Sequence, residues 1–188
     1  MVNLVDKVQT FLAEPSEFFG EVREKSLWKA VLVYFLAGIV SLLAGYLSNF
    51  ISVLLMPKMF SNLFPVLYGV IGIIFLIIGF GLFFIFGAIV HFFSKVIFRG
   101  EGNYNDTMKV LFYGSVPIVL LSFTAVSILF VVYSFILVTI GLSVYHNIRK
   151  SKAFSSAFIP FLLIIGGFIS YLVYLFLHYK IPIFSLPI

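Results

Sequence analysis

The stretch that decides the fold is Tyr113–Tyr145, YGSVPIVLLSFTAVSILFVVYSFILVTIGLSVY, which contains no charged side chain. As one straight helix, its 33 residues would be about 50 Å long, whereas the hydrocarbon core of a bilayer is about 30 Å thick. Ser and Thr residues gather at Ser122–Ser127, and Pro117 lies in the first half of the stretch. This pattern predicts two crossings, over residues 107–123 and 125–146, with Pro117 kinking the first or letting it run obliquely.

The chain as a whole is too apolar for a water-soluble fold. Of its 188 residues, 62% are hydrophobic and 10% are charged, and the mean hydropathy is +1.19. A soluble domain has about 25% charged and about 45–50% apolar residues. Three further apolar runs, over residues 28–56, 64–94 and 154–178, exceed the ~20 residues needed to cross a bilayer. We therefore predict an all-α, polytopic membrane protein whose residues 28–178 form a bundle of five transmembrane helices.

The basic residues favour five crossings over four. With five, ten of the twelve Lys and Arg lie on one side, and only Lys58 and Lys180 lie on the other. With four, the basic cluster at residues 149–152 changes side and the distribution becomes eight against four. Since basic residues concentrate on the cytoplasmic side, we expect a cytoplasmic N-terminus and an extracytoplasmic tail at 179–188. The net charge of +5 then reflects topology and attraction to anionic membrane lipids, and it does not indicate nucleic-acid binding.

Residues 1–27 are predicted to be a cytoplasmic amphipathic segment. Pro15, which suits the first position of a helix, separates two periodic stretches. Apolar side chains recur at helical spacing in both of them: Leu4, Val8, Phe11 and Leu12, then Phe18, Phe19 and Val22. We expect two short helices on the membrane surface or against the bundle; the alternative is a solvated leader whose periodicity is accidental.

No sequence feature predicts a catalytic residue, a bound metal or a cofactor. The chain has no Cys, and no charged residue lies in the central part of a predicted crossing. His91, His146 and His178 each lie near the end of a crossing, where hydrogen bonding at the interface is expected rather than metal ligation. A Gly-x-Ser-x-Gly elbow, a phosphate loop and a dinucleotide fingerprint are all missing. The sequence therefore predicts a protein that is not an enzyme.

Small residues form stripes along the first, second and fifth predicted crossings, for example Ala37, Ser41 and Gly45 in the first. In lipid, helices associate through close packing of such residues. Packing within one bundle is the simpler interpretation. An interface in a homo- or hetero-oligomer uses the same chemistry and stays open as an alternative.

The most distinctive polar stretch is Gly100–Pro117, GEGNYNDTMKVLFYGSVP, which begins in a predicted cytoplasmic loop. Asn103 or Asn105 can cap the helix that follows this loop. The stretch resembles the YIP family, multi-pass membrane proteins named in eukaryotes for interacting with Ypt/Rab GTPases. It shares with them a glycine loop, an aromatic residue and a Tyr-Gly-x-x-Pro element. Glu14–Phe19 followed by Trp28 is similar to the start of prokaryotic members, and the basic cluster at 149–153 fits the end of the fourth crossing.

The resemblance implies five crossings, a cytoplasmic N-terminus and a non-enzymatic role in membrane organisation, vesicle trafficking or partner recruitment. The residues that it nominates for partner binding are Pro15, Phe18, Phe19, Gly100, Gly102, Tyr104, Tyr113 and Pro117. An Asp-Leu-Tyr-Gly-Pro element precedes the first crossing of eukaryotic members and is missing here. A small GTPase as partner therefore rests on family analogy alone, and a prokaryotic member in the cell membrane is expected.

Two functions are consistent with these observations. The first is a non-catalytic scaffold or adaptor that recruits a cytoplasmic protein partner, or shapes the bilayer, through residues 3–26 and the loop at 98–109. The alternative is a small transporter, channel or lipid-handling protein built around the Gly-rich second and fifth crossings. A continuous hydrated cavity would favour this alternative.

Overall fold

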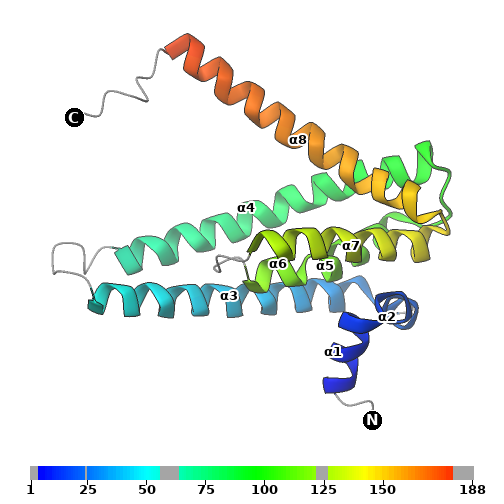
Figure 1. The fold of residues 1–188 in the computed structure, drawn as a ribbon, viewed down its shortest axis with the longest axis horizontal. Helices are drawn as coiled ribbons and strands as arrows, with labels where there is room; N and C mark the ends of the chain where they lie inside the picture. Colours follow the sequence, from blue (N-terminus) through cyan, green and yellow to red (C-terminus); the bar gives the residue numbers. More distant parts are fainter. Residues whose placement is uncertain (1–3, 24, 56–63, 122–126, 180–188) are drawn as a thin grey trace.

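The structure is a computed structural model that describes residues 4–23, 25–55, 64–121 and 127–179. All regular elements in these ranges are helices (Figure 1). Two short helices come first, α1 (Leu4–Ala13) and α2 (Pro15–Val22), and the long α3 (Leu27–Leu55) follows. Next come α4 (Phe64–Phe92), the π-helical turn η2 (Phe93–Ile97), α5 (Tyr104–Gly114) and α6 (Val116–Leu121). The last helices are α7 (Ser127–His146) and α8 (Lys150–Tyr179).

Four stretches of the described helices are long and apolar enough to cross a membrane. They are Leu27–Leu47 in α3, Ile77–Ile97 in α4 and η2, Ile128–His146 in α7, and Lys150–His178 in α8. This confirms an all-helical chain with several apolar helices of membrane-spanning length. The predicted crossing at 107–123 differs from the other four, because α5 and α6 are separate helices of 11 and 6 residues. The predicted break at Ser122–Ser127 lies outside the described residues except for Ser127, where α7 begins.

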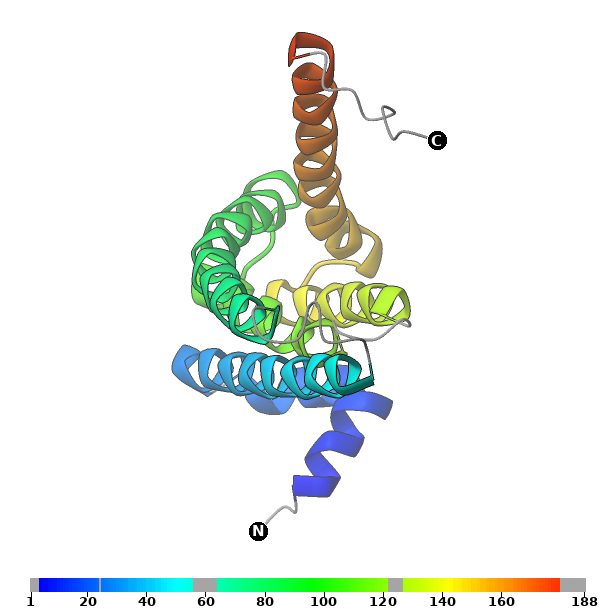
Figure 2. The same ribbon diagram turned by 90° about the vertical axis from the view of Figure 1, so that its left-hand side faces the viewer.

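The long helices α3, α4 and α7 lie around α5 and α6 (Figures 1 and 2). Helix α5 packs against α3, α4 and α7, and α6 packs against α3 and α7. Helix α8 starts against α7 and α4 and then leaves the bundle on the side opposite α1 (Figure 2). Almost all of its side chains beyond Pro160 are exposed, and in a membrane these apolar side chains would face lipid.

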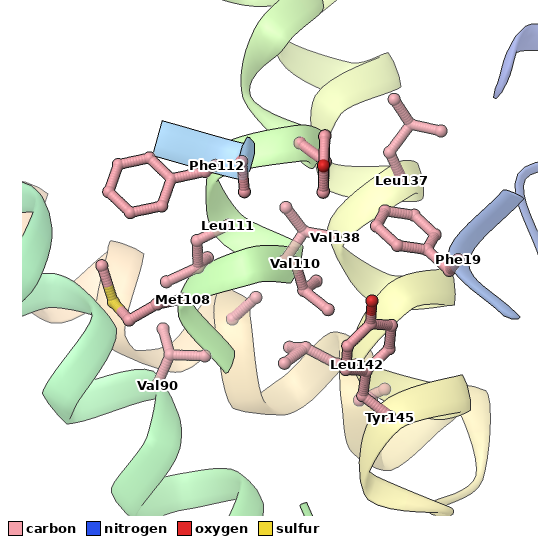
Figure 3. Packing of buried hydrophobic residues seen from close by; sticks show 14 of the residues in the cluster. Phe19, Val90, Met108, Val110, Leu111, Phe112, Leu137, Val138, Leu142 and Tyr145 are labelled. Carbon is pink, nitrogen blue, oxygen red and sulfur yellow. The ribbon is translucent and has the colours of Figure 1, made fainter. Parts of the chain in front are cut away.

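The buried core lies at one end of the bundle and is centred on α5 (Figure 3). Buried side chains converge there from α2, α4, α5 and α7: Phe19, Val90, Met108, Val110, Leu111, Phe112, Leu137, Leu142 and Tyr145. Residues 14–23, 25–29, 95–109 and 146–152 make up the same end and carry most of the charged side chains of the described chain. This part of the molecule is termed the charged end below.

Candidate functional site: the charged end of the bundle

A reciprocal cap fixes the start of α5. Asn103 Oδ1 accepts a hydrogen bond from the backbone N–H of Asp106 at 2.9 Å, and Asp106 Oδ2 accepts one from the N–H of Asn103 at 3.1 Å. This capping box satisfies two N–H groups that would otherwise lack partners at the helix start. Of the two asparagines considered as caps, Asn103 has this role. The cap fixes the residue at which α5 begins, and with it the side of the helix, including Thr107 and Met108, that faces the core.

The loop between η2 and α5 lies on the imidazole ring of His146. Its backbone N–H groups donate to neighbouring helix ends, Gly100 to the carbonyl of Ser94 and Glu101 to the carbonyl of His146, both at 2.9 Å. A Cβ atom on Gly100 would lie 2.8 Å from Cβ of His146, and one on Gly102 would lie 2.8 Å from its Nδ1. Real Cβ atoms essentially never come so close to other heavy atoms. The contact between loop and ring therefore requires both glycines.

Thr107 joins two histidines that are distant in the sequence. Its Oγ1 lies 2.9 Å from Nδ1 of His91 and 2.8 Å from Nε2 of His146, with a longer contact of 3.4 Å to the Asn103 carbonyl. Thr107 and His146 are completely buried, and Nδ1 of His146 has no partner among the described residues. A buried N–H without an acceptor is rarer than an unpaired acceptor. We therefore assign the proton of His146 to Nε2, which donates to Thr107, and Thr107 in turn donates to Nδ1 of His91.

This three-residue chain was not predicted from the sequence, which placed His91 and His146 at separate helix ends. It connects α4, α5 and α7 by side chains alone. The available signal was topological. In the predicted five-crossing topology, both histidines end crossings that reach the same side, so a hydroxyl at the start of the intervening helix can meet both of them.

Tyr104 secures the first turn of α5 against α4. Its hydroxyl donates to the backbone carbonyl of Phe84 at 3.0 Å, and its ring lies edge-on to His91 with 5.8 Å between centroids. The side chain therefore acts as a hydrogen-bond donor that ties the loop to the bundle.

Phe19 anchors α2 in the core. It is completely buried and packs edge-on against Tyr145 at a centroid distance of 6.2 Å. A Cβ atom on Gly141 would lie 2.7 Å from Cγ1 of Val110 and 3.0 Å from the ring of Phe19, so glycine at this position of α7 leaves room for both side chains. Burial of one phenylalanine side chain contributes about 1.5–3 kcal/mol.

Phe18 makes a second contact beside this anchor. Its ring is edge-on to Tyr113, 5.4 Å away, and to Phe11 of α1, 4.8 Å away. Pro15 occupies the first turn of α2 and directs both phenylalanines toward the bundle. Pro117 lies apart from this group, buried in the first turn of α6.

Cationic groups from α5 and the end of α2 meet over Tyr145. Lys109 Nζ donates to the Arg23 carbonyl at 2.8 Å and lies 3.6 Å from Asp106 Oδ1. The Arg23 guanidinium and Lys109 Nζ lie 5.8 and 6.0 Å from the centre of the Tyr145 ring. Both distances suit cation–π attraction. Helices α2, α5 and α7 are thus held together by polar as well as apolar contacts.

The structure places the eight nominated residues mainly inside the charged end. Phe19, Gly100, Gly102, Tyr113 and Pro117 are buried, while Pro15, Phe18 and Tyr104 are partly buried. Their direct contact with a partner stays a prediction, but their observed contacts hold the surface in shape. The charged side chains exposed on that surface include Glu14, Glu17, Glu21, Arg23, Arg99 and Glu101.

Three of these exposed residues, Glu14, Glu17 and Glu21, form an acidic face on α2. They are three and four positions apart, which brings them to one side of the helix. The pKa of the Glu17 carboxyl is raised above its ordinary value, first by the hydrogen bond that its protonated form donates to the Glu14 carboxylate and then by the negative charge of Glu14. Within the described ranges, no group of three or more His, Cys, Asp or Glu residues is close enough to hold a metal ion.

Comparison with known proteins identifies one matching family model, described as the Yip1 domain, which covers residues 9–171. No curated protein and no solved structure gives a significant match to the chain. The matched range includes α2, the loop on His146, the first three stretches of membrane-spanning length and most of the fourth, Lys150–His178.

Proposed function

The chain belongs to the Yip1 domain family, and on this premise we propose that it is a non-catalytic scaffold or adaptor. It is a multi-pass membrane protein of that family, with several apolar helices. In this proposal the charged end lies in the cytoplasm, and its exposed charged side chains bind a protein partner. The resulting recruitment would serve membrane organisation or vesicle trafficking, with a small GTPase as partner by family analogy.

The observation that carries the proposal is the fixed position of α2 on the transmembrane core. The Phe19 side chain of α2 is buried in the core, and Lys109 Nζ donates a hydrogen bond to the carbonyl of Arg23 at the end of α2. The opposite side of the same helix carries the exposed acidic face of Glu14, Glu17 and Glu21. A surface that is already ordered loses less conformational entropy on binding than a flexible one. This arrangement supports recognition of a folded partner.

Electrostatics indicates the kind of partner. Glu14, Glu17 and Glu21 are exposed on one side of α2, where like charges disfavour one another, and the raised pKa of Glu17 is consistent with this proximity. A basic surface placed against them would relieve this repulsion. We therefore propose a partner that presents Lys or Arg side chains to α2, with Arg99 and Glu101 of the adjacent loop setting specificity.

The proposed topology has five crossings, with α5 and α6 together as the third. The range from Tyr104 to Leu121 corresponds to about 27 Å of helix, close to the thickness of the hydrocarbon core. The break at Ser115 lets the two helices follow α7, which packs against both. The concentration of basic residues at the charged end supports a cytoplasmic position for it.

The test is site-specific photo-crosslinking in native membranes. A photoreactive amino acid at Glu17 is expected to trap a reproducible protein partner, whereas the same amino acid at Arg149, exposed at the start of α8, is not. The trapped product should disappear when Glu14 and Glu21 are both changed to Lys. A product that survives this double change, or the lack of any product at Glu17, would overturn the proposed surface.

A further inference from the structure

A second surface feature lies where α2 meets α3, at the start of the first crossing. It is a groove of about 580 Å³, here named the α2–α3 groove. Its lining includes Phe18, Lys25, Trp28, Lys29, Leu32 and Val33. A volume of 300–1,000 Å³ suits a bound small molecule or one segment of a lipid. The groove therefore has the dimensions of a binding site.

The groove changes from polar to apolar along α3. Lys25 and Lys29 lie at its outer end, and Leu32 and Val33 follow within the span Leu27–Leu47. Four helical residues correspond to about 6 Å, so Val33 lies about 6 Å deeper than Lys29. A phospholipid has the same order, because its charged head group lies at the membrane surface and its apolar acyl chains lie deeper.

Trp28 marks the depth at which the membrane surface meets the groove. It is the sole Trp of the chain, it lines the groove, and 78% of its surface is exposed. Trp side chains prefer the level of the lipid head groups. The two lysines beside it are therefore at the depth of the phosphates, and the apolar lining is at the depth of the first acyl carbons.

The charge of the groove selects among lipids. Its described lining contains two lysines and no acidic residue. A groove of similar volume, about 590 Å³, lies between α7 and α8, and its described lining contains one lysine, Lys150, together with Thr139 and apolar side chains. This α7–α8 groove offers an acyl chain similar space but half the positive charge. It provides an internal comparison.

From these observations we propose that the α2–α3 groove binds one anionic phospholipid. The phosphate and negative head group lie against Lys25 and Lys29, and an acyl chain lies over Phe18, Leu32 and Val33. The bound lipid contacts α2 and α3 together, so it ties the N-terminal helices to the first crossing. This inference concerns a ligand and a surface distinct from the acidic face, and it stands independently of the protein partner.

Native mass spectrometry of the purified full chain tests the proposal. Phosphatidylglycerol and phosphatidylcholine with identical acyl chains are titrated separately in a mild detergent. We expect one phosphatidylglycerol to be retained in preference to phosphatidylcholine, and the K25Q/K29Q variant to lose about 10- to 30-fold in affinity for it, since each Lys contributes about 1 kcal/mol. The R149Q/K152Q variant, with the same change in charge on the same side, should bind as the original does.

Two further variants locate the site. The Val33→Trp substitution fills the α2–α3 groove and should abolish preferential retention, whereas Ile136→Trp fills the α7–α8 groove and should not. On the unaltered chain, a photoactivatable phosphatidylglycerol should label the peptide that contains Leu32 and Val33. Equal retention of the two lipids, an equal loss in R149Q/K152Q, or labelling confined to α8 would overturn the proposal.

Discussion

The hydroxyl of Thr107 lies 2.8 Å from Nε2 of His146, a residue 39 positions further along the chain, and both side chains are fully buried. The opposite nitrogen of this imidazole faces the glycine loop and has no partner among the described residues. Thr107 is thus the described residue on which hydrogen bonding of the His146 imidazole depends. The shape of the charged end is sensitive to this one hydroxyl.

Replacement of Thr107 by Val, which keeps the shape and removes the hydroxyl, should destabilise the fold. An unsatisfied buried polar group costs about 1–3 kcal/mol. For a chain of this size, the midpoint of thermal unfolding should fall by about 2–4 °C per kcal/mol. Measurement in detergent with a thermal-shift assay checks this. Thr107→Ser keeps the hydroxyl and should lose less; equal losses for Ser and Val would show that the hydrogen bonds do not matter.

Gly102→Ala should displace the loop from His146. The added Cβ would lie 2.8–2.9 Å from three atoms of the imidazole, and overpacking of this kind costs about 1–3 kcal/mol. Gly81→Ala is the matched control, because a Cβ there meets nothing within 4 Å and alanine favours helix. The thermal midpoint should fall for Gly102→Ala and should not fall for Gly81→Ala. The loop contact would be refuted if both variants unfolded at the same temperature.

Phe19→Ala should detach α2 from the bundle without unfolding the transmembrane helices. Removal of a buried phenylalanine ring costs about 3–5 kcal/mol, most of it borne by the contact between α2 and α7. Trypsin should then cleave after Arg23 at least ten times faster. Leu12→Ala, at a position 55% exposed, serves as control and should leave the cleavage rate unchanged. A cleavage rate for Phe19→Ala like that of the control would contradict the anchoring role.

The five-crossing topology is open to a direct test because the chain contains no Cys. Single cysteines at Glu17, Glu101 and Ser151 should react with an impermeant maleimide from the cytoplasmic side. Cysteines at Lys58 and Lys180 should react from the opposite side. Four crossings would instead put residues 101 and 151 on opposite sides, which the same labelling would show.

Apolar runs and charge determined what could be predicted from the sequence. The apolar run at 28–56 predicted α3 well, because a helix that faces lipid needs a long uninterrupted series of apolar side chains, and such a series is easily recognised in a sequence. The capping role of Asn103 was among the predictions, because an N-cap side chain bonds to backbone N–H groups only a few residues away in the sequence. The break at Ser115 between α5 and α6 was not predicted, because Pro117 suits the start of a helix as well as a kink.

The polar chain through Thr107 and the two grooves could not be predicted, for a different reason. Each depends on side chains from helices that are far apart in the sequence, such as His91 and His146. Without the arrangement of the helices, a histidine at a helix end gives no indication of which hydroxyl it will meet. The nominated Gly100 and Gly102 were noticed as turn residues, whereas their role is close contact with an imidazole ring.

The docking of α1 and α2 on later helices determines when the charged end can form during synthesis. The Tyr133 hydroxyl donates to the carbonyl of Leu12, 121 positions earlier, and Lys109 bonds to Arg23, 86 positions earlier. The N-terminal helices therefore leave the ribosome well before the residues that cover their apolar faces. While the nascent chain grows, the bilayer surface can shelter Phe18 and Phe19, and the two helices move from lipid onto protein once α7 has been inserted.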